Sequence, residues 1–302
     1  MLEELEPNVF VTGSCNQKCI FCSAVNEDRE MTPREIARLL KKPFENLSME
    51  GGEPLLDGEL EKKALAAKKA GAKNIIVLTN GSLLSEKRTR SLLNAGVTTF
   101  NFNLPSCRGK LHDLLTGTKN KFKSKIEIIK KTIKTAPANS VVLTFVVNSL
   151  NYREIPEYVE FAEKKLKGFF YVSLNLVKIK GRVKKNLKLV PKISRVRPYL
   201  KKAFHFAARK GIYIVSDGFP LCAMKGFEYY SIDMYKALHG DSLYAEEKAK
   251  AGICGKCSLC RICFGPRADY LALYGCRELN PFKMDMFRFL SAYYEKSRKK
   301  SK

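Results

Sequence analysis

Short apolar runs alternate with longer amphipathic segments from residue 8 to about residue 175. Six of these runs are nearly continuous apolar stretches, as in strands that are covered on both faces of a parallel sheet. Segments with apolar residues on one helical face lie between them, and the first opens with Thr32, Pro33 and Glu35, the pattern of a capping box. We expect strands at 9–12, 46–49, 74–79, 98–104, 141–148 and 169–175, separated by helices.

This order of elements predicts an α/β fold built from repeated βα units. Six units favour a partial (β/α)6 TIM-like barrel, and a doubly wound sheet is the alternative. After residue 175 the alternation weakens to a basic loop over 178–191, a helix over 195–209 and a short strand over 212–215. From residue 216 onward Cys, Gly and aromatic residues dominate. We therefore expect a core domain over 1–215 and a small Cys-rich C-terminal extension over 216–302.

Composition places the chain among globular proteins with metal or redox chemistry. Its 302 residues are 45 % apolar, which is enough to bury a full core. No apolar run approaches the ~18 residues of a membrane span, so we expect none. The acidic start of the chain lacks the basic and apolar regions of a signal peptide, and we expect a cytoplasmic protein. Ten cysteines in a reducing compartment then indicate metal or redox chemistry rather than disulfides.

Positive charge is unevenly spread along the chain. The formal net charge is +25, although residues 1–60 hold more acidic than basic side chains. The densest basic stretch, 164–210, contains sixteen Lys and Arg and no Asp or Glu. One interpretation is a surface that neutralises the phosphates of RNA or of a phosphorylated substrate. The other is a Lys-rich, thermophile-like composition that keeps the surface solvated, and composition alone leaves both open.

A first group of cysteines follows the first predicted strand directly. Cys15, Cys19 and Cys22 form a C-x3-C-x2-C pattern in a loop at a strand end, where α/β folds place their chemistry. Three thiolates this close fit three corners of a [4Fe–4S] cube and leave the fourth iron open. A structural zinc site usually takes four ligands, and no further Cys or His lies nearby in the sequence.

This pattern resembles the signature of the radical SAM superfamily, in which an aromatic residue precedes the last cysteine. Later segments resemble further family elements in the same order: the GGEP segment after the second strand, TNG at 79–81 and HD-x-L-TG at 112–117. The resemblance covers roughly residues 8–175. It implies that the GGEP segment contacts the amino group of S-adenosylmethionine, and that strand-end amides such as Asn101 contact its ribose and carboxylate. The cofactor-binding residues expected on this basis are Phe21, Gly51, Gly52, Glu53, Pro54, Asn80, Asn103 and Asn175.

The resemblance also implies an activity. Members bind S-adenosylmethionine at a [4Fe–4S] cluster, cleave it reductively and use the resulting 5′-deoxyadenosyl radical to abstract hydrogen from a substrate. We therefore expect an enzyme that takes its electron from a reductant such as ferredoxin or flavodoxin. The metal ligands expected for this cluster are Cys15, Cys19 and Cys22.

A second group of cysteines lies in the C-terminal extension. Cysteines recur every third residue from Cys254 to Cys263, as in ferredoxins, and a zinc knuckle with four cysteine ligands is the alternative. The surrounding sequence resembles the SPASM or twitch extension of radical SAM enzymes. A full SPASM has a further cysteine where this chain has Arg267, so we expect one auxiliary [4Fe–4S] cluster. Its expected ligands are Cys222, Cys254, Cys257 and Cys263, with Cys260 or Cys276 as substitutes.

The sequence leaves three candidate functions open. The SPASM-like extension favours, by analogy, a radical SAM enzyme that modifies a peptide or protein side chain. The basic 164–210 stretch favours instead a radical SAM enzyme that acts on tRNA or on a phosphorylated cofactor precursor. The third function is that of a non-catalytic Fe–S or zinc protein that binds nucleic acid.

Overall fold

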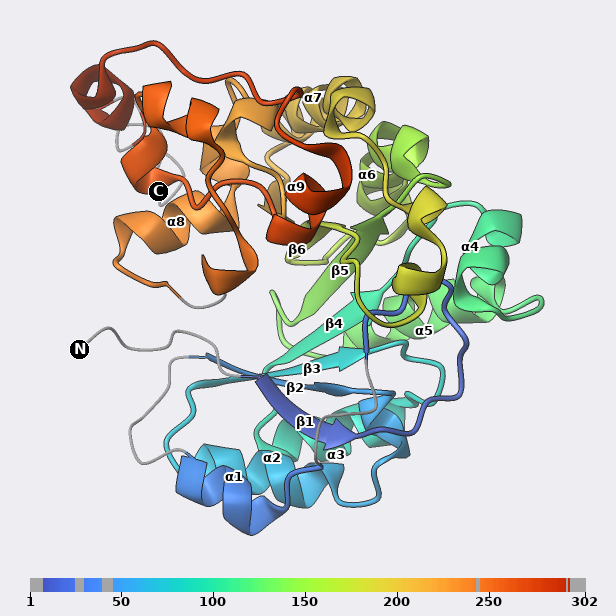
Figure 1. Ribbon diagram of the computed structural model, residues 1–302. Coiled ribbons are helices and arrows are strands. Elements are labelled where there is room, and N and C mark those ends of the chain that lie inside the picture. The colour runs from blue at the N-terminus through green and yellow to red at the C-terminus, as the bar shows by residue number, and fades with distance from the viewer. Residues whose placement is uncertain (1–7, 25–29, 40–45, 243–244, 292, 294–302) are drawn as a thin grey trace.

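A computed structural model describes residues 8–24, 30–39, 46–242, 245–291 and 293 (Figure 1). It contains a seven-stranded sheet in which every strand is parallel to its neighbours and the strands follow one another in chain order. The sheet curves into an open, TIM-like partial barrel, so the predicted α/β class is confirmed. The strands are β1 (Asn8–Thr12), β2 (Asn46–Gly51), β3 (Asn74–Thr79), β4 (Thr99–Asn103), β5 (Val141–Val147), β6 (Tyr171–Leu176) and β7 (Tyr213–Asp217).

Helices connect the strands along the outside of the sheet. Thr32 and Glu35 form the predicted capping box, in which Thr32 N donates to Glu35 Oε2 at 2.8 Å and Glu35 N donates to Thr32 Oγ1 at 3.3 Å. Across the described residues, none of the helices is both long and apolar enough to cross a membrane. The helices are α1 (Pro33–Leu39), α2 (Leu60–Lys69), α3 (Glu86–Ala95), α4 (Gly109–Thr116), α5 (Phe122–Thr135), α6 (Ile155–Lys165), α7 (Ile193–Lys210), α8 (Ile232–Leu238) and α9 (Ala268–Tyr274). Along the outside of the sheet, α1 packs on α2, α2 on α3, α3 on α5 and α6 on α7.

The barrel is one strand longer than the six βα units predicted. The short strand expected at 212–215 joins the sheet as β7 and pairs in parallel with β6 over five residues, from Tyr213 to Asp217. It joins because α7, which precedes it, returns the chain to the sheet edge as the other helices do. The acidic start of the chain (1–7) and the basic tail (296–302) lie outside the described residues.

Alternation along the strands separates the core from the barrel interior. On β4, Phe100 and Phe102 are fully buried, while Asn101 and Asn103 line a cavity on the opposite face. Successive strand residues point to opposite faces, so the sequence TFNFN places two rings under the helices and two amides inside the barrel. The inner face is therefore more polar than expected for strands covered by helices on both faces.

A second, smaller hydrophobic core lies in the C-terminal part of the chain, beside α8 (Figure 1). Its buried residues are Leu221, Met234, Leu259, Ile262 and Phe282. β7 continues the sheet through Asp217, one residue beyond the start of the predicted extension. We therefore keep the division into a core domain and a Cys-rich extension as a proposal, with the sheet contributing its last strand at the junction.

Replacing Phe100 with Ala tests this core. Phe100 is a fully buried residue of β4, so its removal should lower the free energy of unfolding by about 3–5 kcal/mol. Phe287→Ala is the matched control, because that ring is 85 % exposed and its loss should change stability little. Urea unfolding followed by circular dichroism measures both, and equal effects would contradict the assigned core.

Candidate functional site

A cavity of about 310 Å³ lies at the carboxyl ends of the strands. Parallel α/β folds bind ligands at this end, because the loops that follow the strands converge there. The structure brings nearly all of the residues expected at the first cluster and its cofactor to the cavity wall, and Pro54 alone among them is not part of the lining. The expected residues that line it are Cys15, Cys19, Phe21, Cys22, Gly51, Gly52, Glu53, Asn80, Asn101, Asn103 and Asn175.

The cluster loop, which we define as residues 13–24, packs against the GGEP segment. Gly52 N donates to Thr12 O at 2.6 Å, and Glu53 N donates to Ser14 O at 2.7 Å. A Cβ atom on Gly51 or Gly52 would overlap the backbone of Thr12 or Ser14. The two glycines are therefore required for the approach of two backbones, in addition to any contact with a ligand.

The end of α4 supports the other side of the cluster loop. Lys18 N donates to Thr116 O at 3.1 Å, and Ile20 N donates to Leu115 O at 2.9 Å. Gly117 follows with φ 65°, and a Cβ there would lie 2.8 Å from Lys18 O. The HD-x-L-TG segment thus orders the cluster loop, and its His112 is buried and bonded to Asp113 at 2.9 Å.

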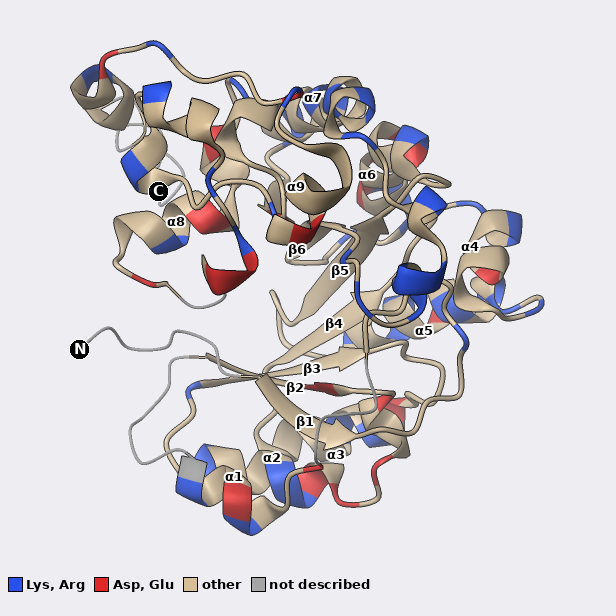
Figure 2. Ribbon diagram, viewed as in Figure 1, with Lys and Arg blue, Asp and Glu red and all other residues tan. Residues whose placement is uncertain are grey.

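A third support comes from the basic stretch, at the 3-10 helix η3 (Gly181–Lys185) after β6. Arg182 N donates to Cys22 O at 3.0 Å, and Arg182 Nη1 donates to Cys19 O at 3.0 Å. A Cβ on Gly181 would lie 2.6 Å from Cys22 O. Figure 2 shows this basic helix beside α4. Arg182, a residue of the predicted basic surface, therefore supports the cluster loop.

Glu53 holds the loop that carries Asn80. Its fully buried carboxylate accepts hydrogen bonds from Asn80 N at 2.6 Å, from Leu55 N at 3.1 Å and from the Thr79 hydroxyl. Burial raises the pKa of Glu53, and these donors oppose the rise. Lys125 of α5 donates to Asn80 O from the other side, and burial lowers the pKa of Lys125 to about 8. No motif in the sequence pointed to Lys125.

The three thiols of the cluster loop suit iron–sulfur ligation. Burial raises the pKa of Cys19 to about 12, and the neighbouring Cys22 and Cys15 contribute to the rise. The Cys19 thiol therefore stays protonated unless a cationic centre takes up its charge, as a metal does. The buried Asn103 Oδ1 has no hydrogen-bond partner within the described part of the chain, so this wall of the cavity still needs a donor. The residues therefore fit a [4Fe–4S] cluster with a ligand that carries N–H or O–H groups.

The second group of cysteines surrounds a small apolar cavity of about 30 Å³. Burial raises the pKa of Cys263 to about 11, and Cys276 is exposed and outside the lining. In the described residues, no three Cys, His, Asp or Glu side chains are arranged to hold a single metal ion. A [4Fe–4S] cube does not require such convergence, because each thiolate binds a different iron. The cysteines that line this cavity are Cys222, Cys254, Cys257, Cys260 and Cys263.

Several residues of the first cavity escaped the sequence analysis. Thr144 lines it from β5 and donates to Asn101 Oδ1 at 2.6 Å. Lys178 and Asp217 line it at the ends of β6 and β7. Asp217 carried a usable signal, because it is the first acidic residue after the 164–210 stretch and ends an apolar strand.

Gly181→Ala tests the support of the cluster loop by η3. The added Cβ would push on Cys22 O and Ala24 O, so reconstituted protein should hold less iron per chain than the wild type. Gly211→Ala is the matched control, because Gly211 also has a positive φ, 68°, but has open space around its Cβ position. Equal iron contents in the two variants would show that η3 does not support the cluster.

Iron analysis also tests the C-terminal cysteines. With two cubes, anaerobic reconstitution should give about eight iron and eight sulfide per chain. Cys276→Ser should retain both clusters because that thiol lies outside the small cavity, and replacement of Cys222 and Cys257 together should halve the iron. About four iron with bound zinc in the wild type would identify a zinc site instead.

The chain is similar in sequence to known proteins over about half of its length. A family model described as "Radical SAM superfamily" matches residues 9–162. A probable GTP 3',8-cyclase of Methanocaldococcus jannaschii is 28 % identical over 202 residues, 58 % of this chain and 65 % of the relative. One of Sulfurisphaera tokodaii is 31 % identical over 161 residues, 51 % of this chain and 50 % of the relative. The chain thus matches between half and two thirds of the length of these curated relatives.

Solved structures share the fold over a larger part of the chain. Streptococcus suis SuiB bound to its precursor peptide SuiA has a TM-score of 0.65 and 18 % identity, over 94 % of this chain and 75 % of that one. The structure of anSMEcpe with bound AdoMet has a TM-score of 0.62 and 18 % identity, over 99 % and 95 %. The family model covers half of this chain, including the cluster loop and the GGEP segment, and the protein therefore belongs to the radical SAM superfamily.

Proposed function

We propose that this radical SAM enzyme abstracts hydrogen from a small purine nucleotide. The carrying observation is a cavity whose wall combines the three cluster-loop thiols, the GGEP backbone and the strand-end amides. When bound, the [4Fe–4S] cluster supplies the electron that cleaves S-adenosylmethionine and so starts hydrogen abstraction. Membership in the superfamily makes the protein an enzyme, and the non-catalytic alternative is set aside.

The choice of substrate is supported by the curated relatives, which are named as probable GTP 3',8-cyclases. It corresponds to the phosphorylated-precursor alternative of the sequence analysis rather than to the peptide that we expected first. Action on tRNA stays a prediction, and the packing of Arg182 against the cluster loop removes one basic side chain from a free nucleic-acid surface.

The protein's own groups have separate tasks in this proposal. The backbone of Gly51 and Gly52 faces the cofactor's polar groups, and Glu53 keeps that wall fixed through the Asn80 loop. Asn103 offers its buried Oδ1 to a donor on the cofactor or substrate. The surrounding strands and loops exclude water from the reacting atoms.

A peptide substrate is the second candidate. It is favoured by the extent of the fold similarity, which includes the Cys-rich C-terminal part: SuiB, solved with its precursor peptide, matches 94 % of this chain. The curated cyclases match only 58 % and 51 %.

Anaerobic turnover tests the proposal. Reconstituted enzyme with dithionite and S-adenosylmethionine should form 5′-deoxyadenosine, measured by liquid chromatography and mass spectrometry, and GTP should accelerate its formation. Cys19→Ala should abolish it, since a cluster ligand is lost, whereas Cys107→Ala should retain it because Cys107 is buried outside both cysteine groups. Turnover by Cys19→Ala would refute the cluster assignment, and a wild-type rate that GTP leaves unchanged would refute the nucleotide substrate.

A further inference from the structure

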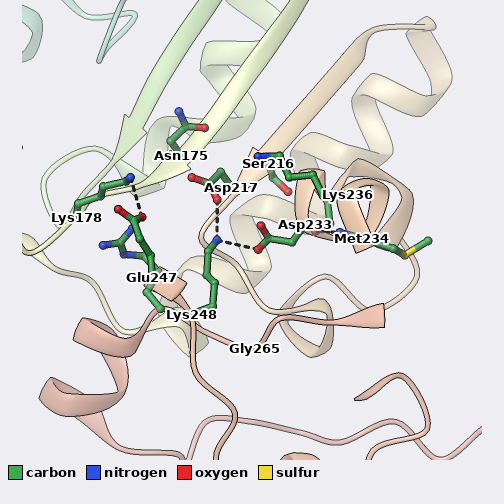
Figure 3. Close-up of polar contacts among 12 residues, drawn as sticks. Asn175, Lys178, Ser216, Asp217, Asp233, Met234, Lys236, Glu247, Lys248 and Gly265 are labelled. Atoms are coloured by element: carbon green, nitrogen blue, oxygen red, sulfur yellow. Dashed lines mark hydrogen bonds and ion pairs between the residues drawn. The ribbon is translucent and has the colours of Figure 1, made fainter. Parts of the chain in front are cut away.

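Two consecutive residues of the C-terminal part, Glu247 and Lys248, bridge to the ends of β6 and β7 (Figure 3). Glu247 Oε2 lies 2.8 Å from Lys178 Nζ. Lys248 Nζ lies 2.8 Å from Asp217 Oδ1 and 2.8 Å from Asp233 Oδ2. Glu247 ends the 3-10 helix η7 (Ala245–Glu247), and the backbone of Lys248 pairs with that of Arg267. The two side chains are thus fixed against the barrel.

The contact favours the ionised forms of Lys248 and Asp217, whereas burial raises the pKa of Asp233. The Lys248 side chain is only 2 % exposed, and burial would lower its pKa, but Asp217 and Asp233 raise it. Burial would raise the pKa of Asp217, but Lys248 lowers it, and the net shift is downward. Asp217 therefore presents a carboxylate, with its side chain 33 % exposed, to the cavity that it lines.

The basic side chains of this wall are already paired. Glu247 binds Arg267 at 3.2 Å as well as Lys178, and Lys248 lies between two aspartates. Acidic and basic groups therefore offset one another here, and a triphosphate gains little electrostatic attraction at this wall. A neutral group with several N–H donors suits it better, because an ionised carboxylate only accepts hydrogen bonds.

Asp217 lies away from the cluster loop and the GGEP segment along the sheet, although its neighbour on β6, Asn175, is itself an expected cofactor contact. β7 is the last strand of the sheet, whereas the cluster loop follows β1 and the GGEP segment follows β2. Both ends of the sheet contribute to the same cavity. A cofactor bound at the cluster loop and GGEP leaves the β7 wall to the substrate.

We propose that Asp217 is a substrate-anchoring residue whose carboxylate accepts N–H donors from the base of a purine nucleotide, with Lys248 as its positioning residue. The inference rests on the nucleotide substrate proposed above. Guanine suits this subsite, because its ring N–H and its 2-amino group donate side by side to one carboxylate. Hypoxanthine lacks the 2-amino group and loses one of the two hydrogen bonds.

Nucleotide binding by the reconstituted, S-adenosylmethionine-loaded enzyme tests the inference, with GTP and inosine triphosphate as probes in isothermal titration calorimetry. The wild type should bind GTP about tenfold more tightly than inosine triphosphate. Asp217→Asn keeps the shape of the side chain but removes the charge, so GTP affinity should fall about ten- to hundredfold and the preference should disappear. Iron content and the thermal midpoint report whether the variant is folded.

Lys248→Met separates positioning from anchoring. It leaves Asp217 and Asp233 without their shared cation, so the preference for GTP should weaken, and Lys248→Arg should restore it. Glu157→Gln is the matched control. It removes one carboxylate charge from the surface of α6, and Glu157 does not line the cavity, so this variant should bind both nucleotides as the wild type does.

The outcomes distinguish this inference from the proposed function. A wild type that binds neither nucleotide overturns the nucleotide substrate, and the subsite with it. A wild type that binds GTP, together with a folded Asp217→Asn that binds it equally well and with the same preference, overturns the anchoring role alone. Loss of preference in Asp217→Asn, with Glu157→Gln unchanged, supports the inference.

Discussion

The placement of the cluster loop depends on close backbone contacts at three glycines that lie far apart in the sequence. Gly52, Gly117 and Gly181 each stand where a Cβ would overlap or crowd the backbone of residues 14–24. The contacts come from segments at or after the ends of β2, α4 and β6, so three separate βα units pack against the cluster loop. Since these contacts involve main chain rather than flexible side chains, they fix the backbone that carries the three thiols.

The strong positive charge of the chain divides into two parts in the fold. Arg182 in η3 lies against the cluster loop and donates to the carbonyls of Cys19 and Cys22, while Lys184 and Lys185 in the same helix are exposed. At the other side of the cavity, the basic groups Lys178 and Lys248 are matched by carboxylates. The net charge of +25 is therefore not found in the first cavity, whose charged lining residues are Glu50, Glu53, Asp217 and Lys178.

Local sequence signals predicted most of the elements, and they placed the first three cysteines in a loop at a strand end. The C-x3-C-x2-C spacing, the capping box at Thr32 and the apolar strands depend on neighbouring residues, and the structure contains each of them. The seventh strand was predicted but not its place in the sheet, because pairing depends on where α7 returns the chain. Lys125 and Asp217 were missed for a related reason: their partners, Asn80 and Lys248, lie 45 and 31 residues away, so no local pattern links them.

The adjacent opposite charges of Glu247 and Lys248 also align the C-terminal segment with the ends of β6 and β7. Their partners Lys178 and Asp217 sit on neighbouring strand ends with the complementary order of charge. A displacement of the C-terminal segment by one residue would place Lys248 against Lys178 in one direction, or Glu247 against Asp217 in the other, and like charges this close repel each other. The order of charge in Glu247 and Lys248 therefore favours one docking register of the Cys-rich part on the barrel.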